Sequence, residues 1–427
     1  MKFQTIKGTK DILPSEIHKW HYVENTVRGV FQRFGYNEIR TPVFEQTALF
    51  QRGIGETTDI VGKEMYSFQP DPESESLTLR PEMTAPVMRA YLQHSLSGTS
   101  PATKVFYISE IFRKERPQAG RQRQFWQFGC ECIGSDQPEA DAEVILLMTE
   151  IYRQLGIKNF TLRLNSLGET ESRLAHREAL QTYLKPHFDL LDEISKTRFE
   201  KNPLRILDSK NPALAEIIAG APHITEFLDD ASKAHFQTVQ TYLKNAGLDF
   251  TVDPTLVRGL DYYSRTAFEL VSTDLGAQDA LAGGGRYDSL ATVLGAKNSS
   301  AAVGFAAGIE RLLIIMEKLD LFQAVLPPAP LLFIATQSPV AKEWAFQTVN
   351  RLRTEGIHVA LDLLGRSLKA QMREANRTHA KYVLIVGEEE LSTGRFQLKH
   401  LQTSEQVELS EADIFTKMQT ETTQDLG

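Results

Sequence analysis

The most informative part of this 427-residue sequence runs FRKERPQAGRQRQFWQFGCE, from Phe112 to Glu131. Its first half, between Arg113 and Arg123, holds five cationic residues and one anionic residue. The resulting local charge of +4 contrasts with the net charge of −8 for the whole chain. An acidic protein can still bind an anion or a nucleic acid through such a local basic patch. This stretch is therefore the first candidate for a binding site.

The residues around this stretch predict two strands, at 104–112 and 123–133, joined by a charged loop. Successive side chains of a strand point to opposite faces. One set of side chains should therefore enter the core, namely Trp126, Phe128, Cys130 and Cys132. The other set is Phe125, Gln127, Gly129 and Glu131, and Gly129 should leave an opening between Gln127 and Glu131. The pattern indicates either an exposed hairpin with a solvated rim or a cationic loop above a small polar pocket for an anion.

The composition is that of an ordinary globular protein, with 41% hydrophobic and 24% charged residues. This composition excludes disordered, collagen-like and coiled-coil chains. The length of the chain corresponds to roughly three domains. Cys130 and Cys132 are too few for a disulfide framework and lack the spacing of a zinc site, so we expect reduced thiols and no metal site. The sequence shows neither a signal peptide nor an apolar run that could span a bilayer. We therefore expect a soluble cytoplasmic protein without a membrane partner.

Hydrophobic periodicity and Pro/Gly positions outline the other elements of the first part of the chain. We expect helices at 17–34 and 139–155, a strand at 36–45 interrupted by Pro42, mostly helical structure at 170–250, and strands followed by a final helix at 251–315. Because proline cannot donate to a strand ladder, the interrupted strand should lie at an edge or cross between sheets.

The run Pro327-Pro328-Ala329-Pro330 predicts a linker between two domains, 1–326 and 331–427. Beyond the linker, strands alternate with helices, at 331–335, 339–355, 357–363, 366–380 and 382–386. This alternation indicates a small α/β domain with parallel strand pairing.

Five segments, taken in order, resemble the signatures of a known family. Gly35–Glu45, Arg113–Glu131 and Ala302–Leu313 resemble motifs 1, 2 and 3 of class II aminoacyl-tRNA synthetases, and Leu256–Tyr263 and Ala282–Asp288 resemble signatures of the histidyl-tRNA synthetase family. Each segment alone has a simpler interpretation. Gly283-Gly284-Gly285, for example, is more often a tight turn or a close backbone approach than a phosphate cradle. The order of all five favours the family over these separate interpretations.

The resemblance covers essentially the whole chain, starting at Gly8-Thr9-Lys10-Asp11. It implies an α+β catalytic domain, in which helices flank an antiparallel sheet, with a helical insertion at about 170–250. A C-terminal α/β anticodon-binding domain should follow. Class II architecture and motif 1 also imply a two-fold homodimer.

The resemblance implies that the protein activates L-histidine by attack of its carboxylate on the α-phosphorus of ATP. Both reactants are anionic, so the site must supply positive charge and hold them in line. Arg113 would contact the α-phosphate and Arg311 the γ-phosphate, with Glu115 and Arg121 beside them. Arg258 would lie between the substrate carboxylate and the α-phosphate, where other class II enzymes use a metal ion. Arg113 and Arg258 are thus the expected catalytic residues, and Mg²⁺ should bridge the outer phosphates.

The resemblance also assigns the residues that select histidine. They are Glu131, Tyr262, Tyr263 and Tyr287 around the imidazole ring, and Glu82, Thr84 and Gln127 around the ammonium group. Such buried polar groups reject apolar analogues strongly, so no editing domain is needed. Met83 stands at a position where glycine is more usual in the family. This difference bears on the shape of the local loop and not on the flanking Glu82 and Thr84.

The remaining expected partner is tRNA(His). Gln118 and Arg123 match positions that would meet its acceptor end. In the C-terminal domain a cationic stripe is expected on one helix, formed by Arg366, Lys369, Arg373, Arg377 and Lys381, with Glu374 as the only acidic residue among them. The alternative for this stripe is a solvated helix face.

Taken together, the resemblance implies an ATP-dependent ligase that joins L-histidine to the 3′ end of tRNA(His). One alternative is the non-ligating relative that serves ATP phosphoribosyltransferase as a histidine-sensing regulatory subunit, but it typically lacks an anticodon-binding domain. The other is a pseudo-synthetase that acts only as an RNA-binding or kinase-associated module. Intact Arg113, Glu131, Arg258 and Arg311 argue against that second alternative.

Overall fold

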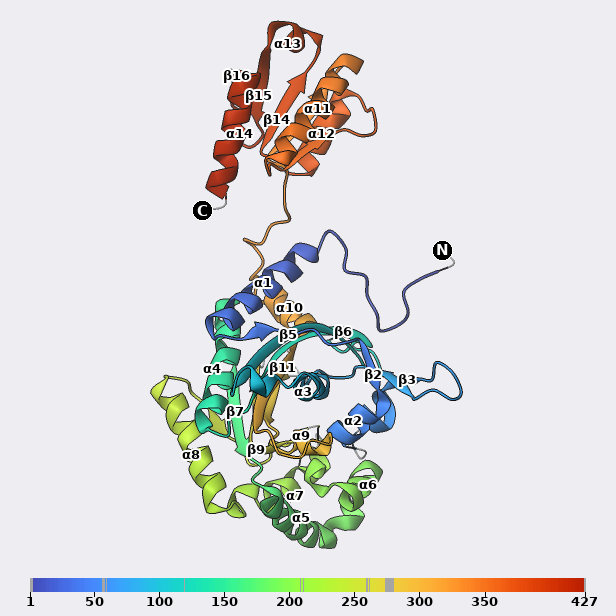
Figure 1. The fold of residues 1–427 in the computed structure, drawn as a ribbon, viewed down its shortest axis with the longest axis vertical. Helices are drawn as coiled ribbons and strands as arrows, with labels where there is room; N and C mark the ends of the chain where they lie inside the picture. Colours follow the sequence, from blue (N-terminus) through green and yellow to red (C-terminus); the bar gives the residue numbers. More distant parts are fainter. Residues whose placement is uncertain are drawn as a thin grey trace. The chain divides into compact units, whose positions relative to one another are not determined.

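The computed structural model describes residues 3–55, 58, 60–118, 120–207, 209, 211–258, 260, 262–272 and 280–425. The chain forms two compact units, Met1–Val325 and Leu326–Gly427 (Figure 1). Each unit has its own sheet and its own hydrophobic core.

Eight strands within the described residues form the main sheet of the first unit, in the order β1-β5-β6-β11-β10-β9-β7-β8. In that order their bounds are Asn37–Glu38, Thr103–Phe112, Gln124–Ile133, Ala302–Gly308, Ala280–Arg286, Ser264–Val271, Thr161–Ser166 and Thr251–Val252. The inner pairs are antiparallel, and the edge strands β1 and β8 pair in parallel with β5 and β7. The predicted antiparallel sheet is confirmed for its inner strands, and the edges make the sheet mixed.

The main core lies against one face of this sheet. It is built with α1 (Ile17–Arg33), α4 (Pro138–Gln154), α8 (Asp230–Asn245) and α10 (Ile309–Lys318). In α1 the buried Val23, Val27 and Val30 recur every three or four residues, which places them on one side of the helix. The predicted helices at 17–34 and 139–155 are confirmed, as is the burial of Phe128, Cys130 and Cys132 in this core.

A second core lies against the opposite face of the sheet. Strand β5 shows the division, because Phe106 and Ile108 belong to the main core while Val105 and Tyr107 belong to the second. The helices on this side include α3 (Thr84–Gln93) and α9 (Leu290–Val293), while α2 (Thr47–Ile54) packs with α3 and α9. Two short helical segments also belong to this part of the chain, η1 (Ile60–Glu64) and η2 (Leu96–Gly98). The candidate site described below lies in this region.

The predicted strand at 36–45 is split on either side of Pro42. The first piece, β1, is the edge of the main sheet, and the second piece, β2 (Phe44–Gln46), joins β4 (Leu77–Leu79) and β3 (Tyr66–Phe68) in a small sheet. The predicted crossing between sheets is therefore confirmed. The physical reason is that proline has no N–H group for the ladder.

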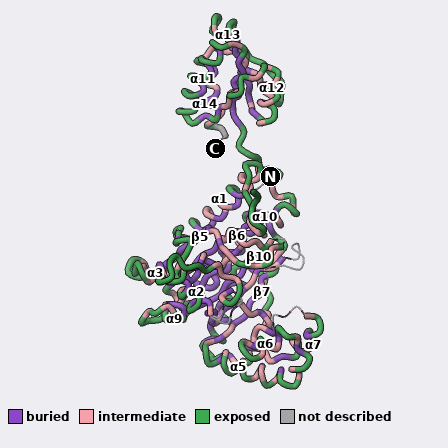
Figure 2. Tube along the Cα trace, turned by 90° about the vertical axis from the view of Figure 1, so that its right-hand side faces the viewer, coloured by how far each residue is buried: buried purple, intermediate pink, exposed green. Residues whose placement is uncertain are grey.

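Residues 170–250 are largely helical, as predicted, and start with a small helical body. Its elements are α5 (Thr170–Leu184), η3 (Lys185–Leu190), α6 (Glu193–Lys201), η4 (Pro203–Ile206), η5 (Pro212–Leu214), α7 (Ala215–Ala219) and η6 (Ile224–Glu226). This body has its own core around Leu180, Leu184 and Leu214, and its outer surface is exposed (Figure 2). Helix α8 differs, because Phe236 and Val239 belong to the main core. We call residues 170–229 the insertion.

The second unit contains the described strands β13-β12-β14-β15-β16, in that order. Its elements are β12 (Leu332–Thr336), α11 (Pro339–Thr354), β13 (Val359–Leu361), α12 (Leu368–Arg377), β14 (Tyr382–Val386), α13 (Glu388–Thr393), β15 (Arg395–His400), β16 (Gln406–Ser410) and α14 (Glu411–Asp425). The predicted parallel pairing holds for β13, β12 and β14, whereas β15 and β16 are antiparallel and were not predicted. The predicted helix at 366–380 was too long at both ends, since α12 spans Leu368–Arg377, and Arg366 and Lys381 of the predicted stripe lie outside it.

Candidate active site

Two adjoining cavities contain the residues predicted for ATP and histidine. The arginine cavity, about 190 Å³, is lined by the predicted residues Arg113, Glu115, Arg121, Gln127, Arg258 and Arg311. The glutamate cavity, about 160 Å³, is lined by the predicted residues Glu82, Thr84, Gln127, Glu131, Arg258, Tyr262, Tyr263 and Tyr287. Arg113, Gln127 and Arg258 line both cavities. The fold thus brings together residues that lie far apart in the sequence, and the two cavities form one site.

Glu131 on β6 is the centre of the glutamate cavity. Its Oε1 accepts hydrogen bonds from Thr84 Oγ1 at 2.9 Å and Tyr107 Oη at 3.3 Å, and its Oε2 accepts one from Tyr287 Oη at 2.5 Å. Burial raises the pKa of Glu131 to about 8, although the hydroxyl donors oppose this shift. The carboxyl group is thus held rigidly in a dry pocket with its ionisation near neutral pH.

The predicted opening at Gly129 does not exist as a gap. A Cβ at Gly129 would lie 2.2 Å from the carbonyl oxygen of Phe305 and 2.5 Å from Tyr107 Oη. The Tyr107 side chain therefore fills the space that the missing side chain leaves, and its hydroxyl reaches Glu131. Tyr107 was not among the residues predicted from the sequence. Its place on the second-core face of β5 follows from strand alternation, but its contact with Glu131 depends on β5–β6 register.

Glu82 and Thr84 lie at the start of α3. Glu82 accepts hydrogen bonds from the backbone N–H groups of Thr84 at 2.7 Å and Ala85 at 2.9 Å, so it satisfies donors that a helix N-terminus leaves free. Burial raises the pKa of Glu82, and these hydrogen bonds oppose the shift. Met83 has φ −111° and packs in the second core. The position does not require glycine, so Met83 leaves Glu82 and Thr84 facing the cavity.

Two buried polar atoms between the cavities have no hydrogen-bond partner among the described residues. They are Gln127 Oε1, an acceptor, and Arg258 Nε, a donor. Arg258 Nη1 pairs with Glu269 Oε1 at 3.2 Å, and its guanidinium lies 5.8 Å from the Tyr263 ring centre. The flanking Gly259 and Asp261 lie outside the described residues. Buried polar groups are normally paired, so this donor and acceptor point to a ligand that offers both a hydrogen-bond acceptor and a hydrogen-bond donor.

The glycine run 283–285 is part of strand β10 and not a turn. A Cβ at Gly283 would lie 2.4 Å from the Arg258 guanidinium, and one at Gly285 would lie 2.8 Å from the Tyr263 ring. Of the two simpler interpretations, close approach is therefore confirmed and the tight turn is wrong. The absence of side chains gives Arg258 and Tyr263 their room against the sheet.

Four arginines and three glutamates among the described residues line the arginine cavity, which leaves a small excess of positive charge. Arg113 Nε donates to the carbonyl of Pro81 at 2.8 Å, and Arg311 Nη1 donates to the carbonyl of Ala280 at 2.8 Å. Glu115 lies 3.5 Å from Arg121 and 4.0 Å from Arg113. Burial, followed by the nearby Arg121, lowers the pKa of Arg311. An anion in this cavity would relieve the mutual repulsion of the guanidinium groups.

The arginine cavity also contains two carboxylates that were not predicted from the sequence, those of Glu269 and Glu310. Both oxygens of Glu310 accept the backbone N–H of Trp126, at 3.0 and 3.1 Å, and burial raises the pKa of Glu310 to about 7. Glu269 joins β9 to Arg258. Glu310 sits beside Arg311 in the motif 3 segment, a signal that could have found it, whereas no local pattern marks Glu269.

The residues predicted to meet the tRNA acceptor end lie around the loop between β5 and β6. Gln118 is exposed, and its backbone pairs with that of Arg121. Arg123 is half-buried, and it donates to the carbonyls of Glu115 and Lys7, both at 3.3 Å. Arg123 therefore holds the N-terminal segment against the loop, and Gln118 is the freer of the two side chains. Ala119, between them, lies outside the described residues.

The cationic stripe of the second unit is shorter than predicted. Arg366 pairs with Asp362 at 2.5 Å, Arg377 with Glu374 at 2.5 Å, and Lys381 with Glu421 at 2.5 Å. Of the predicted set, Lys369 and Arg373 are exposed on α12 and form no ion pair with another described residue. Glu374 is the only acidic residue between 366 and 381, but Asp362 and Glu421, which lie outside that range, reach Arg366 and Lys381 in the folded chain.

Within the described ranges, no cluster of three or more His, Cys, Asp or Glu side chains could hold a metal ion. In the same part of the chain, no helix is both long and apolar enough to cross a bilayer. Cys130 and Cys132 are free thiols, and burial raises the pKa of Cys132 to about 11.

A largely antiparallel sheet with an acidic pocket and an arginine-rich cavity against it, followed by a separate unit with its own sheet, is the architecture of a class II aminoacyl-tRNA synthetase. Comparison with known proteins gives the particular family. Residues 8–312 match the family model "Histidyl-tRNA synthetase", and residues 332–421 match "Anticodon binding domain". The chain belongs to the histidyl-tRNA synthetase family, and the predicted resemblance is confirmed.

Individual relatives agree over nearly the full length. The chain is 53% identical to a histidine–tRNA ligase of Chlorobium phaeobacteroides strain BS1, covering 99% of this chain and 97% of that protein. It is 56% identical to a histidine–tRNA ligase of Pelodictyon phaeoclathratiforme, covering 96% and 95%. Its fold is similar to that of apo S. aureus histidyl-tRNA synthetase, with a TM-score of 0.82 at 36% identity, covering 98% of this chain and all of that one.

Proposed function

We propose that the protein is a histidine–tRNA ligase, which forms histidyl-adenylate from L-histidine and ATP and then transfers histidine to the 3′ end of tRNA(His). The observation that carries the proposal is the unpartnered pair Gln127 Oε1 and Arg258 Nε, beside the buried Glu131. An amino acid offers an ammonium donor for the first atom and a carboxylate acceptor for the second. The matched anticodon-binding domain favours this function over a histidine-sensing regulatory subunit.

The glutamate cavity supports selection of histidine. An imidazole N–H would donate to Glu131, whose position is fixed by Thr84, Tyr107 and Tyr287. Tyr262 and Tyr263 are buried, with ring centres 4.7 Å apart, and would enclose the flat ring. An apolar side chain of similar size would leave Glu131 without its ligand partner, and such unpaired groups give strong discrimination.

The arginine cavity supports the chemistry of activation. A carboxylate oxygen of histidine attacks the α-phosphorus of ATP, the bond to the β-phosphate breaks, and pyrophosphate leaves. Arg258 lines both cavities, so it can contact the carboxylate and the α-phosphate together. Arg113 and Arg311 would hold the α- and γ-phosphates, with Arg121 beside them. Fixed guanidinium groups stabilise the charge that develops in such a transition state without reorganising.

Mg²⁺ is expected to come with ATP, because the outer phosphates of a nucleotide usually bind it. Glu115 is the carboxylate of the predicted set that faces the arginine cavity, and its oxygen atoms are ligands of the kind Mg²⁺ prefers. The ion would reduce the charge on the leaving pyrophosphate.

Transfer to tRNA would use the loop between β5 and β6 at the acceptor end, where Gln118 is exposed and Arg123 supports the loop. In the second unit, Lys369 and Arg373 are exposed cations of the predicted set, while Arg366 would act by fixing the start of α12 through Asp362. Phosphate contacts of this kind contribute affinity in a salt-dependent manner.

The first unit also offers a surface for a homodimer. The lining of a cavity of about 840 Å³ mixes apolar side chains, such as Ile39 and Pro42, with charged ones, such as Arg40 and Arg52, and Phe44 nearby is half exposed. An exposed surface that combines apolar side chains with charged neighbours can serve as an interface, and a two-fold dimer would pair it with its own copy. The buried free thiols Cys130 and Cys132 fit a reducing compartment, in agreement with a cytoplasmic ligase.

The decisive experiment is amino-acid-dependent ATP–pyrophosphate exchange, measured for each of the twenty amino acids. Exchange with L-histidine alone is the expected result. Exchange with a different amino acid would mean that the protein activates that amino acid and not histidine. No exchange by a folded protein would favour the regulatory or pseudo-synthetase alternatives.

A further inference from the structure

Three neighbouring strands place a row of positions on the active-site face of the main sheet. Glu269 on β9 lies directly opposite Arg163 on β7 and, on its other side, opposite Gly283 on β10. Residues opposite each other on antiparallel strands point to the same face, so the three positions form a row. Leu162 and Leu164, the neighbours of Arg163 along β7, belong to the main core, so the row points to the other side of the sheet. From that side Glu269 and Gly283 line the arginine cavity.

The position of Gly283 has no side chain of its own, and the guanidinium of Arg258 occupies it. A Cβ at Gly283 would lie 2.4 Å from both Nη1 and Nη2 of Arg258. Arg258 thus lies against the backbone of β10, and its Nη1 is 3.2 Å from Oε1 of Glu269. Packing against a glycine does not by itself choose the orientation of a planar guanidinium, whereas a charge-assisted hydrogen bond does. The orientation of Arg258 therefore depends on Glu269.

Glu269 is shared between two arginines, with one on each carboxylate oxygen. Oε1 pairs with Arg258, and Oε2 lies 3.6 Å from Nη1 of Arg163. Arg163 also pairs with Oδ2 of Asp253, whose Oδ1 accepts hydrogen bonds from the backbone N–H and the hydroxyl of Thr255 at 2.9 and 2.6 Å. We call Asp253, Arg163, Glu269 and Arg258 the charged row, because the signs of their charges alternate along it. A carboxylate that is engaged at both oxygens turns less freely, so Arg163 keeps Oε1 of Glu269 directed at Arg258.

The charged row leads from the protein surface into the active site. The side chain of Arg163 is 35% exposed and lines neither active-site cavity, whereas Glu269 lines the arginine cavity and Arg258 lines both. Exposed ion pairs contribute little to stability, so stability alone does not account for the row. Its inner end holds Arg258 by Nη1 and leaves Nε buried without a partner among the described residues. A guanidinium held on one side in this way presents its remaining donor to a ligand.

We propose that Glu269 and Arg163 are positioning residues for histidine activation. Glu269 orients the guanidinium of Arg258 toward the carboxylate of histidine and the α-phosphate of ATP, and Arg163 keeps Glu269 in that orientation. The inference rests on the proposed function, in which Arg258 contacts both groups. A displacement of about 1 Å in a catalytic group can lower the rate about a hundredfold, so the orientation of Arg258 should affect kcat.

A different role for Glu269 makes the opposite prediction. Its negative charge offsets part of the positive charge of the arginine cavity, and this alone would weaken the binding of ATP. Removal of the charge would then lower the ATP KM and leave kcat unchanged. Positioning predicts instead that removal of the charge lowers kcat. The two roles are therefore separated by measuring kcat and KM independently.

The test is histidine-dependent ATP–pyrophosphate exchange by the full-length protein, with kcat and both KM values determined. Glu269→Gln removes the charge and keeps the size of the side chain. Arg163→Ala breaks the charged row outside both cavities, and Arg163→Lys restores the positive charge. Lys19→Ala is the matched control, because Lys19 is half-buried, pairs with Glu317 on a different helix at 3.0 Å and lines neither active-site cavity.

Positioning predicts that Glu269→Gln lowers kcat about tenfold or more and that Arg163→Ala lowers it about threefold to tenfold. Arg163→Lys should recover most of this loss, and Lys19→Ala should keep the kcat of the parent protein. In the Arg258→Ala background, Glu269→Gln should change the residual exchange less than about twofold, because the group that Glu269 orients is gone.

The proposal is overturned if Glu269→Gln keeps kcat within about twofold of the parent protein, whether or not the ATP KM falls. It is also overturned if Glu269→Gln lowers the residual exchange of Arg258→Ala by the same factor as in the parent protein. If Glu269→Gln does not fold, Arg163→Ala decides the question by the same criteria.

A folded parent protein without histidine-dependent exchange would contradict the proposed function and leave the orientation of Arg258 to a second measurement. Urea unfolding of Glu269→Gln, Arg258→Ala and the double variant provides it without any activity. Losses of stability that do not add show that Glu269 holds Arg258, and additive losses overturn that contact.

Discussion

Gly304 on β11 lies directly opposite Glu131 on β6, and a Cβ at Gly304 would be 1.8 Å from Glu131 Oε2. The carboxylate thus occupies the space where any other residue would place its side chain. Glu131 can take this position because Gly304 has no side chain. The three hydroxyl donors then hold the carboxylate in place.

Gly304→Ala should therefore abolish histidine activation by displacing Glu131, because backbone and carboxylate cannot both stay in place. We expect exchange activity to fall by about a hundredfold or more. Gly29→Ala is the matched control, since it adds a Cβ on α1 with only Arg33 Nη1 nearby, at 3.7 Å. That variant should keep full activity. Normal activity of Gly304→Ala in the exchange assay would contradict this account of Glu131.

Glu131→Gln should change the pH dependence of stability. Burial raises the pKa of Glu131 from an ordinary value of 4.5 to about 8, so between these values the folded state holds a proton that the unfolded state has lost. Glu131 therefore stabilises the fold least at high pH. Its contribution to the free energy of unfolding falls by about 1.4 kcal/mol per pH unit as the pH rises from 4.5 to about 8.

The difference in unfolding free energy between the Glu131→Gln variant and the parent protein, measured with urea from pH 5 to 8, should shift in favour of glutamine as pH rises. A constant difference would mean that Glu131 is ionised in the folded state throughout. The variant should also show a raised histidine KM with little change in the ATP KM, because Glu131 lines the glutamate cavity and not the arginine cavity.

Arg258→Ala should remove activation while the fold and ATP binding persist. Its guanidinium lines both cavities, and loss of such a preorganised charge typically costs several kcal/mol in the transition state, about a hundredfold to a thousandfold in rate. Arg377→Ala serves as a control, because Arg377 lies in the second unit, pairs with Glu374 and has a side chain that is 71% exposed. Exchange kinetics and ATP binding by calorimetry check both variants, and near-normal exchange by Arg258→Ala would remove it from the catalytic set.

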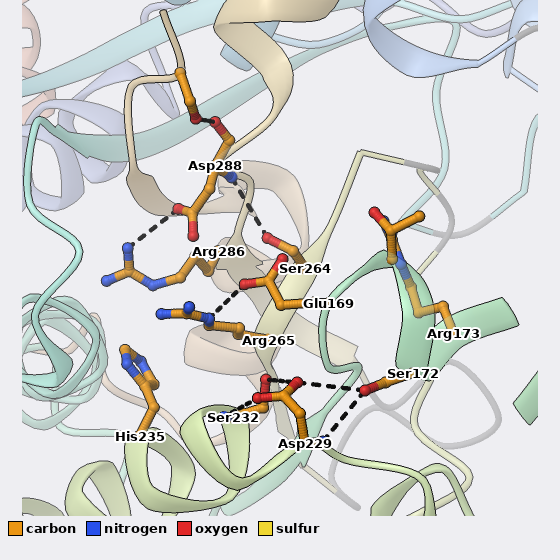
Figure 3. Close-up of polar contacts among 12 residues, drawn as sticks. Glu169, Ser172, Arg173, Asp229, Ser232, His235, Ser264, Arg265, Arg286 and Asp288 are labelled. Carbon is orange, nitrogen blue, oxygen red and sulfur yellow. Dashed lines mark hydrogen bonds and ion pairs between the residues drawn. The ribbon is translucent and has the colours of Figure 1, made fainter. Parts of the chain in front are cut away.

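Arg286 should be essential for folding and not for chemistry. It is fully buried on β10, where it pairs with Asp141 and with Asp288, the latter at 3.2 Å (Figure 3). Arg286→Ala leaves buried carboxylates without their partner, which typically costs about 3–5 kcal/mol. We expect a clear loss of Tm, in contrast to Arg377→Ala, whose exposed pair with Glu374 contributes little to stability. An unchanged Tm would show that Asp141 and Asp288 find other partners.

A chain ending at Val325 should keep histidine-dependent exchange but charge tRNA(His) poorly. All residues of the two active-site cavities precede this point, and Val325 ends the first compact unit. The exposed Lys369 and Arg373 lie beyond it, so the loss should appear as a raised tRNA KM with a shallower salt dependence. The oligomeric state of the truncated chain is measured first, as a control for aggregation. Full charging efficiency by a folded truncated chain would show that the second unit contributes nothing to tRNA binding.

The sequence by itself determined the family and the main elements, because these depend on local patterns. The alternation from Phe125 to Cys132 assigned each side chain of β6 to its face, and the Pro42 break correctly separated two strands. The motif residues such as Glu131 and Arg258 could be named because the family places them at fixed points along the chain.

Only the tertiary structure decided what surrounds those residues. Tyr107 fills the space at Gly129 and Gly304 makes room for Glu131 through strand register, while Glu269 on β9 holds Arg258 of a neighbouring loop, and no single segment encodes these contacts. The cationic stripe lost most of its charge for the same reason, since Glu421 reaches Lys381 across 40 residues of sequence. Local spacing sets which way a side chain points, but its partners depend on segments that meet only when the chain is folded.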